Sequence, residues 1–302
     1  TLFRSGGNAT FNAGQLINQG GTTRLIAQGD VALNAVNTGF QTNAIGDSNN
    51  YYKVGQTQDI GSVVASQGST YIQSKGGSIT GTAVTIHSED GSSYLDANKD
   101  ITLKEGRATS NTDTAIKTTE KSLLSRKTTQ DRYSRTSDEA IQSNLEGNTV
   151  VMDAGRNIHL TATRAVSASG TASTAGHDVT IDAAQNRYRE SSSHNEKKSG
   201  IFGANSGIGF TIGSRMQSAD QTGTHTTAAA STVGSVGGDV NIIAGNAYQQ
   251  VGSDVMAPKG DVNVVAKEVQ IVEARETGSS ATEQRFKQSG LSVSIGSPII
   301  SA

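Results

Sequence analysis

Short segments in which apolar and polar residues alternate recur along the whole chain. Five of them read DITLKE, NIHLTA, DVTIDA, DVNIIA and DVNVVA, and they begin at Asp100, Asn157, Asp178, Asp239 and Asp261. A period of two, with Val, Ile and Thr as frequent members, is typical of β-strands that bury one face. The Gly, Asp and Asn residues around these segments predict tight turns between the strands.

The spacing of these strands predicts a repeat. The first apolar residues of the strands are Val31, Ile79, Ile101, Ile158, Val179, Val240 and Val262. Their successive intervals are 48, 22, 57, 21, 61 and 22 residues. A unit of 21–22 residues, interrupted by three long insertions, accounts for this series, and a fixed period of this size is typical of a solenoid.

The strand chemistry decides which solenoid to expect. A second short strand follows within each unit, as in Val84–Ile86 and Val269–Ile271. Neither a Leu ladder with a helix in each unit nor a 3.6-residue period is present, so leucine-rich, tetratricopeptide and ankyrin repeats are excluded. We therefore expect an all-β parallel β-helix with 21–22 residues in each coil, whose equivalent positions stack about 4.8 Å apart.

The insertions are expected to be long β-hairpins. They cover about residues 37–67, 105–147 and 186–232, and a fourth begins at 273–302. Residues 188–215 and 274–298 share an order of features: Arg-Glu, a Ser-rich stretch, a basic patch, Ser-Gly and an alternating apolar strand. Loops of this length generally carry structure or function of their own. We expect residues 1–302 to form a single β-helix that is a piece of a longer protein.

Two apolar strands in these arms form the candidate site. Their apolar positions are Ile208, Phe210 and Ile212 in the first strand and Leu291, Val293 and Ile295 in the second. The basic residues that flank them are Lys197, Lys198, Arg215 and Lys287. A strand with one apolar face and nearly this length suits contact with a membrane. The same alternation also suits a soluble hairpin that packs on the β-helix or on a neighbouring arm, so both interpretations stand.

Composition agrees with a thin core rather than a globular one. Apolar residues make up 33% of the chain and aromatic residues 4%, with 35 Gly, two Pro, no Trp and no Cys. The formal charge of −2 provides no electrostatic attraction for nucleic acid. Without Cys, neither disulfides nor thiolate metal sites can form.

Catalytic and metal sites find little support. The histidines His87, His159, His177, His194 and His225 lack metal-ligand spacing, and no cofactor motif is present, so we expect neither a metal nor a cofactor. Parallel β-helices also occur in polysaccharide lyases and hydrolases, whose sites need converging carboxylates. Asp178, Asp239 and Asp261 recur at one expected coil position, but each precedes Val in a turn, where capping the turn explains it. We expect no enzyme.

Longer stretches resemble a known family. They are TVGSVGGDVNIIAGNAYQQVGSDVMAPKGDVNVVAKEVQIVEARET, EQRFKQSGLSVSIGSPII and KKSGIFGANSGIGFTIGSR. These resemble the haemagglutinin-repeat region of the two-partner-secretion exoproteins. Within that group, the second repeat region of the contact-dependent growth inhibition toxin-delivery proteins is most similar, and filamentous haemagglutinins are looser relatives. The resemblance is dense over residues 148–302 and fades over 1–147.

This resemblance implies a right-handed β-helix in a secreted exoprotein at the bacterial cell surface. It also implies an outer-membrane secretion partner of the Omp85 type and a C-terminal toxin module elsewhere in the same exoprotein. The segment would then be a non-catalytic part of contact-dependent toxin delivery that engages the outer membrane of the target cell through its arms. The alternative is an adhesin repeat that binds host surface glycans or matrix.

Overall fold

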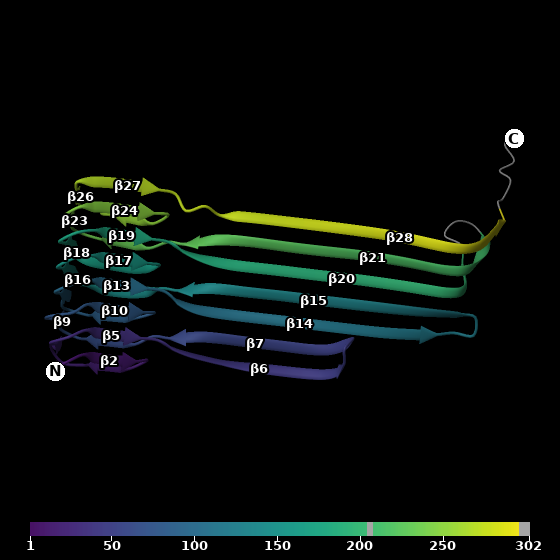
Figure 1. Cartoon of the computed structure of the whole chain (residues 1–302), viewed down its shortest axis with the longest axis horizontal. Coiled ribbons are helices and arrows are strands. Elements are labelled where there is room, and N and C mark those ends of the chain that lie inside the picture. The colour runs from purple at the N-terminus through teal and green to yellow at the C-terminus, as the bar shows by residue number, and fades with distance from the viewer. Residues whose placement is uncertain (204–207, 296–302) are drawn as a thin grey trace.

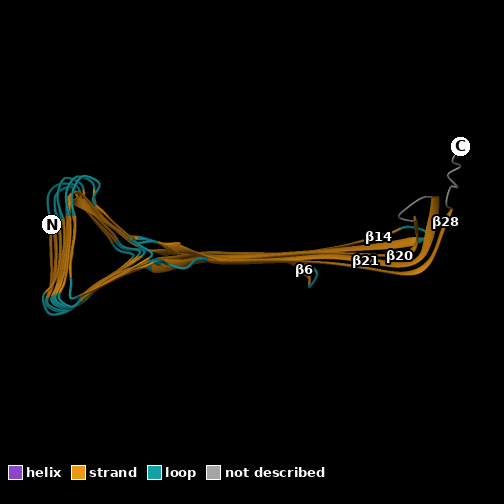
Figure 2. Cartoon of the chain, turned by 90° about the horizontal axis from the view of Figure 1, so that it is seen from above, coloured by secondary structure: helices purple, strands orange, loops and turns teal. Residues whose placement is uncertain are grey.

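The chain forms a three-sided stack of coils from which a single flat sheet projects (Figures 1 and 2). The computed structural model describes residues 1–203 and 208–295, and no helix occurs among them. Parallel strands make the coils and antiparallel hairpins make the projecting sheet. The expected all-β fold, a parallel β-helix with long β-hairpin insertions, is therefore confirmed.

The described residues form seven coils with three faces each and an eighth coil with its first two faces. The first-face strands are β1 (Leu2–Ser5), β4 (Thr23–Ala27), β9 (Thr70–Ser74), β12 (Ser93–Ala97), the second halves of β16 (Ser143–Ala154) and β18 (Thr163–Ala175), β23 (Val240–Ala244) and β26 (Val262–Val265). The second-face strands are β2 (Ala9–Asn12), β5 (Val31–Asn34), β10 (Ile79–Thr82), β13 (Ile101–Lys104), β17 (Ile158–Thr161), β19 (Val179–Asp182), β24 (Ala247–Val251) and β27 (Glu268–Val272). The third-face strands are β3 (Gln15–Asn18), β8 (Val63–Ser66), β11 (Thr85–Ser88), the first halves of β16 and β18, β22 (Thr232–Ser235) and β25 (Asp254–Met256).

The core is a narrow column inside the coils, because every second residue of each strand points inward. On the second face the inward residues are in register from coil to coil, and they are Val31, Ile79, Ile101, Ile158, Val179 and Tyr248. All of them are buried. Buried hydroxyls, such as those of Ser88 and Thr70, hydrogen-bond one another within the column. Branched apolar side chains and buried Ser and Thr hydroxyls together fill this narrow column.

The register corrects one expectation from the sequence. Val179 pairs with Tyr248, 69 residues later, while Val240 and Val262 pair with each other on the first face. Asp178 thus precedes a second-face strand, and Asp239 and Asp261 precede first-face strands, so the three do not share one coil position. The error has a physical cause. Strands on both faces begin with Gly-Asp-Val or His-Asp-Val, and this local pattern does not reveal to which face a strand belongs.

Seven long strands form the projecting sheet, here called the arm sheet. They are β6 (Val36–Asp47), β7 (Asn50–Ile60), β14 (Gly106–Lys121), β15 (Ser125–Ile141), β20 (Ala184–Gly203), β21 (Ile208–Ala229) and β28 (Thr277–Ile295). Their order in the sheet is the order of the sequence, and each pairs antiparallel with the next.

The arms form one sheet because of where they leave the coils. The excursions follow β5, β13, β19 and β27, so they all start at the end of the second face, and they start in every second coil. Two coils are about 9.6 Å high, and the two strands of a hairpin are equally wide, because both spacings are about 4.8 Å. Each hairpin therefore reaches its neighbour at hydrogen-bonding distance.

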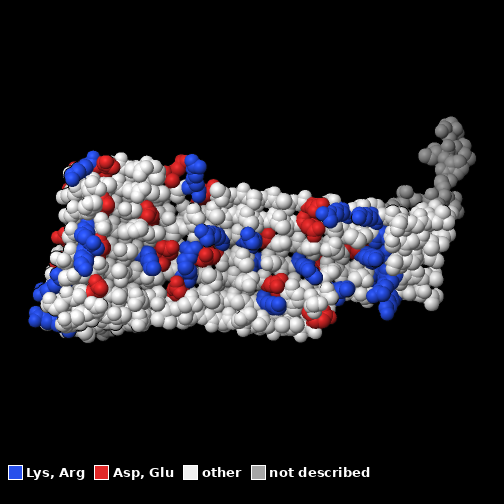
Figure 3. All heavy atoms as spheres, in the orientation of Figure 1, with Lys and Arg blue, Asp and Glu red and all other residues white. Residues whose placement is uncertain are grey.

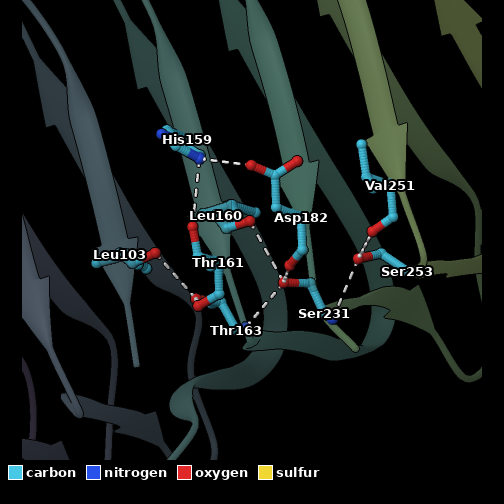
Figure 4. A network of polar contacts seen from close by, with 9 residues as sticks. All are labelled: Leu103, His159, Leu160, Thr161, Thr163, Asp182, Ser231, Val251 and Ser253. Carbon is cyan, nitrogen blue, oxygen red and sulfur yellow. Dashed lines mark hydrogen bonds and ion pairs between the residues drawn. The ribbon is translucent and has the colours of Figure 1, made fainter. Parts of the chain in front are cut away.

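A buried serine closes each of the three coils to which the chain returns from a complete hairpin. The hydroxyl of Ser231 donates to the carbonyl of Asp182, the last residue of β19, at 2.7 Å (Figure 4). It also accepts the N–H of Thr163 in the coil below at 2.9 Å. Ser62 and Ser143 make the same two kinds of bond at the bases of the other hairpins, to carbonyls at 2.9 and 2.7 Å and from amides at 3.2 and 3.1 Å. These bonds hold the coil shut across the base of the arm.

The coils without arms turn this corner differently. Ala13, Ala83 and Ala162 occupy it with φ values of 48°, 49° and 41°, and Gly252 occupies it with a φ of 52°. A residue with left-handed backbone conformation makes the sharp turn at this corner. In the neighbouring coils an arm takes the place of this turn. The two corner types alternate along the stack.

Candidate functional site

The outermost part of the arm sheet is uncharged. This part, here called the arm end, comprises residues 122–125, 199–203, 208–214 and 289–295, and none of these residues is charged. The register places the four segments side by side, since Ser125 pairs with Gly200, Gly200 with Gly213, and Gly213 with Gly290. Figure 3 shows Lys and Arg gathered just before this end and only uncharged atoms beyond them among the described residues.

The structure brings the predicted site residues together. Ile208 pairs with Ile295, Phe210 with Val293, and Ile212 with Leu291, in adjacent antiparallel strands β21 and β28. The side chains of Phe210, Ile212, Leu291 and Val293 are 43–68% exposed. They do not pack on the β-helix, because the arm end lies at the far end of the projecting sheet from the coils (Figure 2). The part they play in function stays a prediction.

Three further exposed apolar residues belong to the arm end, and the sequence analysis missed them. Leu123 and Leu124 lie in the turn between β14 and β15 and are 97% and 59% exposed. Ile201 pairs with Ile212, and its N–H donates to the carbonyl of Leu124 at 2.8 Å. The signal was available for the leucines, since two adjacent Leu between Lys121 and Arg126 are unusual in a polar turn. Nothing local marked Ile201, whose place depends on register.

A row of three glycines separates the apolar rows from the basic residues. Gly200 and Gly290 have φ values of +110° and +137°, which side chains rarely tolerate. Gly213 lies between them, and a Cβ there would be 2.1 Å from the carbonyl oxygen of Ser289. This row breaks the regular strand geometry across three strands. Figure 2 shows the outer ends of β20, β21 and β28 turning out of the plane of the sheet.

The basic residues at the base of the arm end are partly neutralised. The carboxylate of Glu196 lies 3.1 Å from Lys127 Nζ, 3.5 Å from Lys198 Nζ and 4.0 Å from an Arg215 nitrogen. Partial burial opposes ionisation of this carboxyl, but the hydrogen bond from Lys127 and the charge of Lys198 outweigh it and lower the pKa of Glu196. Glu196 is therefore ionised at neutral pH. The guanidinium of Arg215 also lies over the ring of Phe202.

The described residues offer no metal centre. No three His, Asp or Glu side chains in residues 1–203 and 208–295 come close enough to hold an ion. The contacts between His159 and Asp182 and between His177 and Asp178 are single pairs at the surface. Within the same described part of the chain, we find no helix with the length and apolar character needed to cross a membrane.

Comparison with known proteins identifies the family. A family model described as hemagglutinin repeat matches residues 123–290, which is more than half of the chain and includes β15, β20, β21 and most of β28. The chain belongs to the hemagglutinin-repeat family. The resemblance found in the sequence is thereby confirmed, and the family places the chain in a secreted exoprotein of the bacterial cell surface. No solved structure matches it.

Relatives of this hemagglutinin-repeat chain include large proteins with nuclease names. It is 31% identical over 217 residues to tRNA nuclease CdiA of Yersinia mollaretii, covering 71% of this chain and 7% of the relative. It is 28% identical over 304 residues to tRNA nuclease CdiA-2 of Burkholderia pseudomallei, covering 97% and 10%. A third is 16S rRNA endonuclease CdiA of Enterobacter cloacae, 34% identical over 184 residues, covering 59% and 5%.

The chain thus spans a tenth or less of the length of these relatives. The matched part is a hemagglutinin repeat, so the nuclease activity in their names belongs to those whole proteins and does not come with this region. A repeat region fits a non-catalytic, structural segment of a two-partner-secretion exoprotein.

Proposed function

We propose that this chain is a delivery segment for contact-dependent toxin delivery and that its arm end engages the outer membrane of the target cell. The proposal includes an Omp85-type transporter as the secretion partner and a C-terminal toxin module elsewhere in the exoprotein. The β-helix then serves as a rod, and the arms present the arm end away from that rod.

One observation carries the proposal: the arm end is apolar, uncharged and exposed, and basic residues lie directly behind it. Exposed apolar patches bordered by polar residues mark sites of membrane or protein interaction. Lys and Arg next to an apolar end favour a membrane, because their long side chains reach the head groups while the apolar part enters the acyl region. The order of residues along the strands, from basic through Ser and Gly to apolar, follows the polarity of a bilayer surface.

The test is binding of the chain to outer-membrane vesicles after the arm end is made polar. In the variant Phe210→Ser with Leu291→Ser, two exposed apolar side chains are lost. At about 1.5 kcal/mol for each apolar side chain removed from water, the pair contributes about 3 kcal/mol, or about a hundredfold in the binding constant. Co-sedimentation with vesicles measures this loss.

A matched control replaces two equally exposed apolar residues of the arm sheet that lie outside the arm end. Phe40 and Ile116 are 56% and 58% exposed, and Phe40→Ser with Ile116→Ser is expected to leave vesicle binding unchanged. Equal loss in both variants, or wild-type binding by the arm-end variant, would contradict the proposed role of the arm end.

Adhesion to surface glycans is the second candidate, and one feature favours it. The rings of Tyr188 and His225 stack on the arm sheet with their centres 4.4 Å apart, and Gly278, the next residue across the sheet, has no side chain to cover them. The two rings line a hollow together with Arg135 and Glu190. Aromatic faces beside charged and hydroxyl groups suit sugar rings. Loss of glycan binding in Tyr188→Ala, with vesicle binding retained, would favour adhesion.

A further inference from the structure

The two faces of the arm sheet differ in charge just behind the arm end. Side chains of a strand alternate between faces, and registered neighbours share one face. The unbroken register from β14 to β28 therefore assigns each residue to a face. One face carries Lys197, and we call it the Lys197 face; the other carries Glu196, and we call it the Glu196 face.

From the row of Lys117 outward, the Lys197 face carries basic residues and no acidic residue among those described. Its charged residues in these rows are Lys117, Lys121, Arg126, Lys197, Arg285 and Lys287. Arg285 pairs with Glu283, which lies one row further back on the same face. None of the described acidic residues lies within ion-pair distance of the other five. The unpaired basic side chains therefore give this face a positive potential that attracts anionic groups.

The Glu196 face is close to neutral in the same rows. Lys127, Lys198 and Arg215 are its basic residues there, and all three lie around the carboxylate of Glu196. Glu120 pairs in register with Lys127 and adds a second acid to the face. The two faces thus differ in net charge just behind the arm end.

A hollow lies in the Lys197 face, and its lining suits an anion. Its volume is about 400 Å³, and it is lined by Lys117, Arg126 and Lys197 together with Thr128, Asn195 and Ser199. Glu196 also lines the hollow, but its carboxylate pairs with Lys127 and Lys198 on the other face. Three cations with hydroxyl and amide donors are the groups that hold a phosphate.

The hollow lies at the depth of a head group when the arm end is in contact with a bilayer. Lys197 precedes Ile201 by four strand residues, a distance of about 13 Å along the strand, and Arg126 pairs with Ser199 only two residues before Ile201. Lys and Arg side chains extend several ångströms toward such an interface.

We propose that the Lys197 face binds the phosphate groups of anionic lipids, with one head-group phosphate in the hollow of Lys117, Arg126 and Lys197. The proposal rests on the proposed function of the arm end as a membrane contact and adds to it a lipid class and an orientation. The Lys197 face turns toward the lipid surface, and the Glu196 face turns away.

The experiment compares two double variants that remove the same charge from opposite faces. Arg126→Gln with Lys197→Gln alters the Lys197 face, and Lys127→Gln with Lys198→Gln alters the Glu196 face. The intact chain and both variants are titrated with vesicles of phosphatidylcholine alone and with vesicles of phosphatidylcholine and phosphatidylglycerol. We expect the wild-type chain to bind the anionic vesicles more tightly, and more so in low salt.

The expected result is a difference between the faces. Two basic residues near an anionic surface are worth about thirtyfold in binding, so Arg126→Gln with Lys197→Gln weakens binding to anionic vesicles by about that factor. The Glu196-face variant changes it by about threefold or less, because its charges are already paired. Binding to phosphatidylcholine alone stays the same for all three proteins.

Four results would overturn the inference or the proposal on which it rests. Equal losses in the two double variants would show general charge attraction without a preferred face. Saturable binding of inorganic phosphate to the chain without vesicles, lost in Arg126→Gln with Lys197→Gln, would assign the hollow to free phosphate. Absence of wild-type binding to either kind of vesicle would reject the membrane contact itself, whereas binding without a preference for anionic vesicles would reject only the lipid class.

Discussion

Because the height of two coils equals the width of one hairpin, deleting a single coil should disrupt the arm sheet. Residues 240–261 form one arm-free coil, and Val240 is in register with Val262, so their removal joins Asp239 to Val262 and leaves the coils stacked. The arm that contains β28 then moves about 4.8 Å toward β21, which is the full width of a strand. It arrives at the place that β21 already occupies, and the pairing of β21 with β28 over Ile208–Thr226 and Thr277–Ile295 cannot form.

Hydrogen exchange of the β28 amides measures this effect. Each backbone hydrogen bond contributes about 0.5–1.5 kcal/mol net, and β28 pairs with no strand other than β21 among the described residues. We expect the amides of residues 277–290 in the deletion variant to exchange at nearly the rate of an unfolded chain, while those of β20 and β15 stay protected.

Deleting two coils with their hairpin is the matched control. Val150 and Val240 are in register through Thr171, so removal of residues 150–239 takes out two coils and the arm β20–β21. This keeps the spacing, and β28 is expected to pair with β15 and retain its protection. Wild-type protection of β28 in the one-coil deletion, or its loss in the two-coil deletion, would refute the spacing argument.

Three smaller changes probe the coils. Ile101→Ala removes a buried side chain between Ile79 and Ile158. It should lower the free energy of unfolding, measured by urea denaturation, by about 2–5 kcal/mol. A change under about 0.5 kcal/mol, typical of a surface site, would show that the stacked column does not stabilise the fold. Ser231→Ala leaves the buried amide of Thr163 without its acceptor and removes one of the two hydrogen bonds to the carbonyl of Asp182, which still accepts the N–H of Ala162. The change should cost about 1–3 kcal/mol in the same assay, and full stability would show that the serine does not close the coil. Burial raises the pKa of Tyr248 from 10.0 to about 12. The free energy of unfolding should therefore fall as pH rises from 10 through 12, because the unfolded state loses the phenolic proton first. The fall should be smaller in Tyr248→Phe, and identical pH profiles of the two proteins would show that the Tyr248 hydroxyl does not cause it.

The sequence by itself determined the local structure of this protein. Alternation at Ile101, Ile158 and Val179 fixed the strands and their inward side chains, because the side-chain direction of a strand depends only on its period of two. The intervals of 21–22 residues fixed the coil, and the long polar excursions indicated the hairpins. The apolar strands around Phe210 and Leu291 were visible for the same local reason.

The tertiary structure alone decided which distant strands meet. Turn-and-strand patterns are alike on the first and second faces, so only the stacking shows that Val179 lies over Tyr248 and that Val240 belongs to another face. Register between strands far apart in the chain places Leu124 beside Ile201 and Ile201 beside Ile212. The same register separates the Lys197 face from the Glu196 face. The single arm sheet forms because the height of two coils equals the width of one hairpin. Both distances are spacings between strands that are far apart in the chain, so no local stretch of sequence contains them.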